Sequence, residues 1–82
     1  MENLEELFSL LAVEDYDVDY NSRLPFGKAV ITKNQFNRIK LVMQLVGKVT
    51  MNADTTIYAL WGDHEVRMYK VEEGKFDLII YW

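Results

Sequence analysis

The chain has 82 residues, of which half are apolar and 13% are aromatic, with a net charge of −4 and no cysteine. A chain of this length supports one hydrophobic core, so we expect a single domain over residues 1–82. The composition excludes intrinsic disorder, and the missing cysteines exclude disulfides, a thiol nucleophile and thiolate metal sites. The N-terminus lacks the basic region of a signal peptide, and no apolar run approaches the ~20 residues that span a bilayer. We therefore expect a soluble protein of the cytoplasmic type.

The charges fall into three blocks along the chain. Residues 1–22 carry seven acidic and no basic residues, residues 23–53 carry six basic and no acidic residues, and residues 54–82 are acidic again. Two interpretations remain open. Either the acidic N-terminal block lies beside the basic middle block and the two neutralise each other, or one block binds an oppositely charged partner.

Residues 3–12 are predicted to form a short helix, with leucines and a phenylalanine at helical spacing. Asn3 is suited to cap its start, and Glu5 and Glu6 lie in the first turn, where the helix dipole favours negative charge. Such a short helix is unstable alone, so we expect it to pack on the rest of the domain.

Residues 15–20 alternate between acidic and apolar side chains, which predicts a strand. On this strand Asp15, Asp17 and Asp19 would share one face at a spacing of about 6.6 Å, with Tyr16 and Tyr20 on the other. Residues 21–27 read as a loop because of their serine, proline and glycine. A second strand over residues 28–31 is expected to form a hairpin with the first.

Residues 32–47 are predicted to form the central helix. Thr32 and Gln35 have the spacing of a capping box, and Gly47 is placed for a left-handed C-terminal cap. Leu41 and Leu45 lie on the side of the helix away from its core-facing stripe. That stripe contains Phe36, Ile39, Val42, Met43 and Val46.

Three strands are predicted after this helix, over residues 55–61, 64–71 and 75–82, and none is predicted between Gly47 and Thr55. Two-residue turns at 62–63 and 73–74 would join them into an antiparallel meander. If the turns set the register, Lys70 lies opposite Asp77, and Ile79 faces the helix. The same register sets Ala59 opposite Val66 and Tyr81, and Ile57 opposite Met68 and Ile79.

The face of the meander away from the helix is then unusually apolar for a solvent-facing sheet. Either the N-terminal helix and hairpin cover this face, or a second chain does. Its expected residues are Tyr58, Leu60, Tyr69, Val71, Phe76, Leu78, Ile80 and Trp82, interrupted by Thr56, Glu65 and Arg67. The fold class is therefore α+β, with an antiparallel sheet packed on a central helix in the order α-β-β-α-β-β-β.

Motifs for catalysis or cofactors are missing. The row of aspartates begins like a calcium-binding EF-hand loop, but position six is Tyr20 and position twelve is Phe26, where glycine and glutamate are required. A looser metal site built from two of these aspartates stays open. His64 is the single histidine and has no nucleophile nearby in sequence, which is typical of a polar turn residue. The glycines are isolated, so no phosphate-binding loop is present. We expect no enzyme and no cofactor.

Nucleic-acid binding through the basic side of the central helix is a weaker alternative. Lys33, Arg38 and Lys40 could contact phosphates. The isoelectric point near 4.8 argues against it, because nucleic-acid domains are typically basic.

The acidic surface supports a different prediction: a small, non-enzymatic binding protein that inhibits or regulates a basic protein partner such as a nucleic-acid enzyme. DNA-mimicking inhibitors, anti-defence proteins and nuclease immunity proteins act through such surfaces. The expected contact residues are Glu5, Glu6, Asp15, Asp17 and Asp19 for the electrostatics, with Tyr16 and Tyr20 as flanking anchors. Alternatively, the protein is a structural or assembly subunit that self-associates through Leu41 and Leu45 or through the second sheet face.

Overall fold

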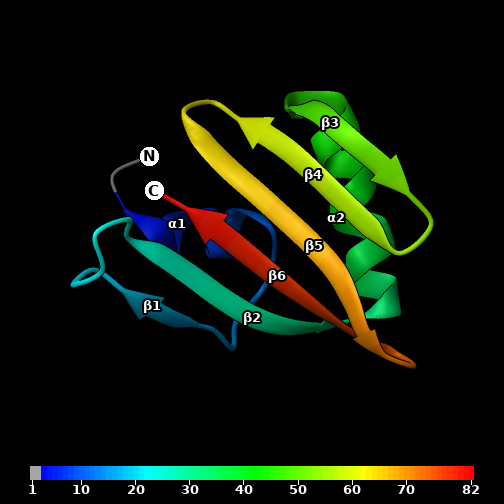
Figure 1. The fold of residues 1–82 in the computed structure, drawn as a ribbon, viewed down its shortest axis with the longest axis horizontal. Coiled ribbons are helices and arrows are strands. Elements are labelled where there is room, and N and C mark those ends of the chain that lie inside the picture. The colour runs from blue at the N-terminus through cyan, green and yellow to red at the C-terminus, as the bar shows by residue number, and fades with distance from the viewer. Residues whose placement is uncertain (1–2) are drawn as a thin grey trace.

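The computed structural model describes residues 3–82 and contains two helices and a six-stranded antiparallel sheet (Figure 1). The elements in chain order are α1 (Leu4–Leu10), β1 (Asp17–Asp19), β2 (Phe26–Thr32), α2 (Lys33–Val46), β3 (Lys48–Ala53), β4 (Thr56–Trp61), β5 (His64–Glu72) and β6 (Lys75–Tyr81). This confirms the α+β class and the predicted order of elements, with one additional strand, β3. Residue Glu2 of the acidic block lies outside the described residues.

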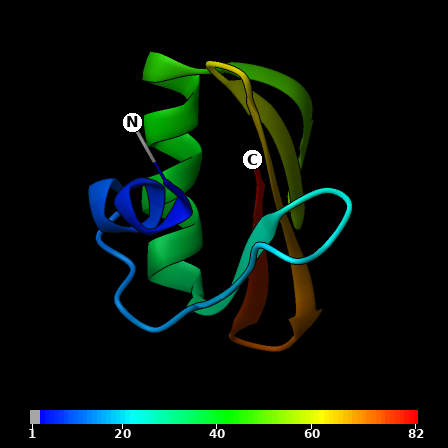
Figure 2. The same ribbon diagram turned by 90° about the vertical axis from the view of Figure 1, so that its left-hand side faces the viewer.

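The strands are arranged in the order β1-β2-β6-β5-β4-β3, so β1 and β3 form the two edges. Figure 2 shows that α1 and α2 both lie against the same face of the sheet. The opposite face carries no helix in the described part of the chain. The N-terminal helix therefore does not cover the second face of the meander, which was one of the two expected arrangements.

The central helix begins as predicted. The Thr32 hydroxyl accepts from the Gln35 backbone N–H, and the Gln35 side chain accepts from the Thr32 backbone N–H, which completes the capping box. The prediction of a left-handed cap at Gly47 is wrong, because this residue is extended, with φ −113° and ψ −166°. Glycine is needed there for space instead: a Cβ atom would lie 2.7 Å from the Leu60 carbonyl oxygen. The chain thus passes directly from α2 into β3.

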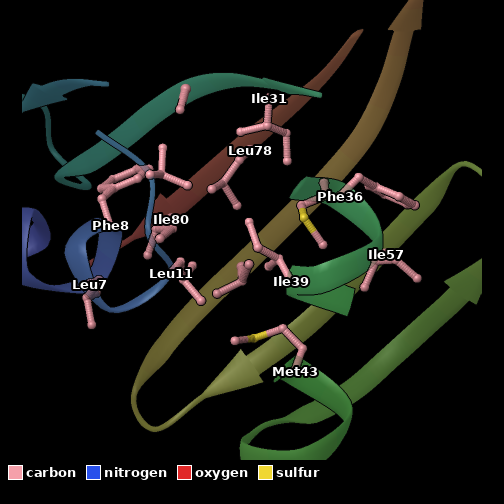
Figure 3. Packing of buried hydrophobic residues seen from close by; sticks show 14 of the residues in the cluster. Leu7, Phe8, Leu11, Ile31, Phe36, Ile39, Met43, Ile57, Leu78 and Ile80 are labelled. Atoms are coloured by element: carbon pink, nitrogen blue, oxygen red, sulfur yellow. The ribbon is translucent and has the colours of Figure 1, made fainter. Parts of the chain in front are cut away.

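The core lies between the two helices and the covered face of the sheet, as Figure 3 shows. Phe36 of α2 stacks on Phe76 of β6 with ring centroids 4.2 Å apart. The predicted stripe of α2 is only partly buried, because Val42 is partly exposed and Val46 is 58% exposed. The buried side chains from the helices are Leu4, Leu7, Phe8, Phe36, Ile39 and Met43.

The predicted N-terminal hairpin is confirmed, although its first strand is shorter than expected. Asp17 pairs with Lys28, and Asp19 pairs with Phe26. The alternation also holds, since Val18 lies opposite the buried Gly27 and packs against the core while the aspartates are exposed. Asp15 precedes the strand.

Strand β3 was not predicted, although residues 48–53 alternate between polar and apolar side chains. The alternation does not match the observed faces of the sheet, because a bulge interrupts the pairing of this strand with β4. Its register on β4 shifts between Val49 and Met51, so the two side chains fall on different faces of the sheet although they are two residues apart. Val49 packs against the core, whereas Met51 is exposed. A bulge of this kind also makes an edge strand a poorer template for unwanted pairing.

The predicted register of β5 on β6 is wrong by one residue. A shift between Lys70 and Glu72 leaves Val71 as an extra residue, so Lys70 lies opposite Phe76 rather than Asp77. Of the two turn residues only Gly74 has a positive φ, so the turn lacks the type I′ geometry that fits the strand twist. The bulge lies directly beside this turn.

The shifted register exchanges the two faces of β6, because neighbouring residues on a strand point in opposite directions. Val66 pairs with Ile80 and Met68 with Leu78, whereas Ala59–Val66 and Ile57–Met68 pair as predicted. Phe76, Leu78 and Ile80 therefore belong to the core and not to the second face.

Within residues 3–82, no helix has the length and apolar character needed to cross a membrane.

Candidate binding face

The face of the sheet opposite the helices, called here the open face, is crossed by three rows of side chains. Cross-strand neighbours in an antiparallel sheet point to the same side, so the register defines each row. The first row contains Lys48, Leu60, Glu65, Tyr81, Phe26 and Asp19; the second contains Met51, Tyr58, Arg67, Ile79, Lys28 and Asp17; the third contains Ala53, Thr56, Tyr69, Asp77 and Val30. The open face thus mixes aromatic, aliphatic and charged side chains in its middle and is acidic at the β1 edge.

Arg67 occupies the middle of the open face and is held from three directions. Its guanidinium carbon lies 5.0 Å from the centroid of the Tyr58 ring and 5.5 Å from that of Tyr81, as in cation–π contacts. Its Nε donates to the Glu65 carboxylate, and this hydrogen bond raises the pKa of Arg67. Leu24, from the loop before β2, lines a hollow beside Arg67 and Tyr81.

Lys28 is the other cation in the second row, and it also forms an ion pair. Its Nζ lies 3.4 Å from the Asp77 carboxylate, which is buried at 7% exposure. A buried carboxylate needs such a partner because desolvation otherwise disfavours its charge. The sequence-based pairing of Lys70 with Asp77 is wrong, since Lys70 instead forms an ion pair with Glu73.

The β1 edge carries the three predicted aspartates, which we call the acidic rim: Asp15, Asp17 and Asp19. Asp19 accepts hydrogen bonds from the backbone N–H groups of Asn21 and Ser22, at 2.9 and 3.1 Å, and so organises the following loop. Asp15 and Asp17 are exposed and form no ion pair with any other described residue. Lys28 is the register neighbour of Asp17, but its ammonium group is paired with Asp77.

The structure thus answers the question of whether the charge blocks cancel at the acidic rim. The ion pairs between described side chains join Lys28 with Asp77, Arg67 with Glu65, Lys70 with Glu73 and Lys75 with Glu72. None of them involves a residue of the acidic rim. The two charge blocks therefore do not pair with each other at the acidic rim.

Tyr16 and Tyr20 point toward α1 rather than outward with the aspartates. The Tyr16 ring stacks on Phe8 with centroids 4.6 Å apart. The Tyr20 hydroxyl donates to the Glu5 carboxylate and accepts from the Leu4 backbone N–H. The hydrogen bond to Glu5 raises the pKa of Tyr20. These contacts attach α1 to the residues on either side of β1 and place Glu5 on the helix side of this edge.

Glu6 is exposed on α1, and its backbone N–H donates to the Asn3 cap. The predicted self-association residues, Leu41 and Leu45, are 60% and 84% exposed on α2. Among the basic residues of this helix, Arg38 donates to the Leu11 carbonyl oxygen at 2.9 Å and so helps to attach α1 to α2.

Residues 3–82 hold no group of three histidine, cysteine or acidic side chains arranged to bind a metal ion. His64 stacks on Trp82 with ring centroids 4.5 Å apart, and its Nδ1 is buried without a hydrogen-bond partner in the described chain. No nucleophilic side chain contacts this ring in the hydrogen bonds that the structure shows.

Comparisons with protein-family models, with curated proteins and with solved structures found no match to this chain.

Proposed function

We propose that this protein is a non-enzymatic binding protein that inhibits or regulates a basic protein partner, such as a nucleic-acid enzyme. The observation that supports this most is the acidic rim, where Asp15 and Asp17 have no cationic partner within the described chain. The chain contains nine basic residues, so the exposed charge of the rim does not result from a shortage of cations.

Exposed carboxylates at regular spacing attract a basic groove by the same electrostatics that phosphates use. Residues two apart on a strand are separated by about 6.6 Å, so Asp17 and Asp19 hold their charges in a fixed row. Glu5 adds a negative charge on α1, on the helix side of β1, where its carboxylate accepts from the Tyr20 hydroxyl. Such attraction increases the association rate and weakens as salt is added.

Capture from host-cell lysate tests this proposal with three immobilised baits. The first is wild type, the second is the triple variant D15N/D17N/D19N, and the third is a control, D54N/E72Q/E73Q, which makes the same change in net charge at exposed residues in or beside hairpin turns. Circular dichroism and thermal unfolding confirm that each bait is folded. Bound proteins are identified by mass spectrometry at low and high salt.

The proposal predicts that wild type and the control retain a basic protein that the rim variant and high salt release. Equal retention by all three baits would contradict a role for the rim. Loss of the same protein from both variants would show that only net charge matters, which also contradicts a defined acidic site.

Assembly through α2 is the second candidate, because Leu41 and Leu45 are exposed one helical turn apart. It predicts an oligomer that forms with increasing concentration and persists in high salt, as apolar contacts do. Sedimentation velocity over a hundredfold range of concentration distinguishes the two candidates.

A further inference from the structure

We propose that the basic protein partner docks on the open face of the sheet, with Tyr58, Arg67 and Tyr81 at the centre of the contact and the acidic rim at its margin. This inference rests on the proposed function and adds the surface that the partner covers. It involves residues that do not belong to the acidic block of the sequence.

The open face has the composition of an interface centre. Aromatic residues and arginine are enriched at the energetically dominant positions of protein interfaces. Tyr58, Tyr69 and Tyr81 stand in neighbouring rows around Arg67. Leu60 and Met51 add exposed apolar surface, at 43% and 45% exposure. The open face thus combines charged side chains, of which four are paired with each other, with tyrosines and exposed aliphatic side chains, a mixture that suits a surface that a partner covers.

Arg67 is also held in place before any partner binds. Two tyrosine rings and the Glu65 carboxylate fix its guanidinium group. Tyrosine side chains have few rotatable bonds, so ordering them on binding costs little entropy. A face ordered in this way binds with a smaller entropic cost than a flexible loop.

The distribution of charge selects a basic protein as the occupant. Glu65 neutralises Arg67 and Asp77 neutralises Lys28, so the middle of the open face offers apolar contact with little net charge. The unpaired charge at the β1 margin is negative, and the unpaired charge at the opposite, β3 margin is the single cation Lys48. This distribution complements a partner that is apolar where it meets the tyrosines and basic where it meets β1.

The same distribution argues against two other occupants. A nucleic-acid strand needs free cations for its phosphates, whereas Arg67 and Lys28 are paired and the margin is acidic. A second copy of the chain would bring one of two surfaces to the acidic rim. Another acidic rim would repel it, and the β3 end of the three rows offers only one cation, Lys48, to three aspartates.

The inference is tested with the purified basic protein that lysate capture identifies as dependent on the acidic rim. Its affinity is measured by titration calorimetry for wild type, Y58A, L60N and the control L45A, which lies on the outward side of α2. Leu60 is partly exposed, so L60N keeps the test valid even if Y58A folds poorly. We expect Y58A to weaken binding roughly tenfold or more, L60N to weaken it several-fold, and L45A to leave it unchanged.

Unchanged affinity in both Y58A and L60N would overturn the docking of the partner on the open face, while the acidic rim and the proposed function would stand. Loss of binding in L45A with retention in Y58A would likewise overturn it in favour of α2. Two further measurements use wild type and Y58A alone. If wild type forms a dimer and Y58A does not, the open face binds a second copy of the chain. If wild type binds a 20-nucleotide oligothymidine and Y58A does not, the face binds nucleic acid. Either result would contradict the inference.

Discussion

The two faces of this one sheet differ in almost every physical respect. Along β6, Leu78 points to the helices and is completely buried, whereas its neighbour Ile79 points to the open face and is only partly buried. The covered face is apolar and packs on α1 and α2, while the open face carries tyrosines, a fixed arginine and paired charges. The alternation of a strand thus separates the residues that stabilise the fold from those that are available to bind.

The largest expected effect compares the two neighbours on β6. L78A should lower the free energy of unfolding by about 2–5 kcal/mol, because it leaves a cavity in the core. I79A should lower it by roughly 1 kcal/mol or less, since it removes a side chain that is only partly buried. Urea unfolding followed by circular dichroism measures both. If I79A proved the more destabilising, the register without a bulge at Val71 would be the correct one.

The next effect concerns the junction of α2 and β3. G47A should destabilise the protein by about 1–3 kcal/mol, because the new Cβ would meet the Leu60 carbonyl oxygen at 2.7 Å and force the backbone apart. G62A tests a different cause, since Gly62 has a φ of +61° and open space around it. Its expected cost is smaller, about 1 kcal/mol, from the left-handed backbone alone. Equal thermal stability of G47A and wild type would contradict the close approach.

A smaller effect is expected where α1 meets the β1 edge. Y20F removes the hydrogen bonds with Glu5 and with the Leu4 backbone and should cost about 1 kcal/mol at pH 7. The bond to Glu5 raises the pKa of Tyr20 above its ordinary value of 10.0, so its stabilisation is complete below pH 10 and is lost as the pH rises through the folded-state pKa.

The difference in stability between wild type and Y20F should therefore shrink above pH 10, as measured by urea unfolding at several pH values. The comparison with Y20F removes the effect of lysine titration, which the two proteins share. A difference that stays constant from pH 7 to pH 11 would contradict the raised pKa of Tyr20, because the hydroxyl would then lose its proton equally readily in the folded and unfolded states.

The smallest effect is expected on the outward side of α2. L45A should change the free energy of unfolding by less than about 0.5 kcal/mol, because Leu45 is 84% exposed. The sedimentation coefficient should also be unchanged if α2 makes no contact between copies. A clear fall in stability that depends on protein concentration would instead support assembly through this helix.

Much of the fold follows from local patterns in the sequence. The capping box at Thr32 and the two-residue turn before His64 are fixed by residues close to each other in the chain, and both are confirmed. The alternation of residues 15–20 also gives the correct faces for Val18 and the aspartates. Such features depend on short-range chemistry that a single sequence displays.

The bulges could not be predicted in this way, and they decide the candidate site. A bulge at Val71 changes which side of β6 faces the helices, but no residue type requires it. Because of that shift, Tyr81 joins Tyr58 and Arg67 on the open face, while Phe76 and Ile80 leave it. The turn at residues 73–74 contains the one sequence feature that could have indicated an irregular register between β5 and β6. Its first residue is glutamate rather than the asparagine or aspartate typical of a type I′ turn.

The most direct test of the account is the protection of single cysteines, because the chain has no cysteine of its own. V30C places a thiol on the open face, and L45C places one on the outward side of α2; both native side chains are well exposed. The rate of thiol modification is measured with and without a saturating amount of the basic partner. We predict that the partner slows modification of V30C severalfold and leaves L45C unchanged. Protection of L45C with V30C unaffected would contradict the assignment of the open face as the binding surface.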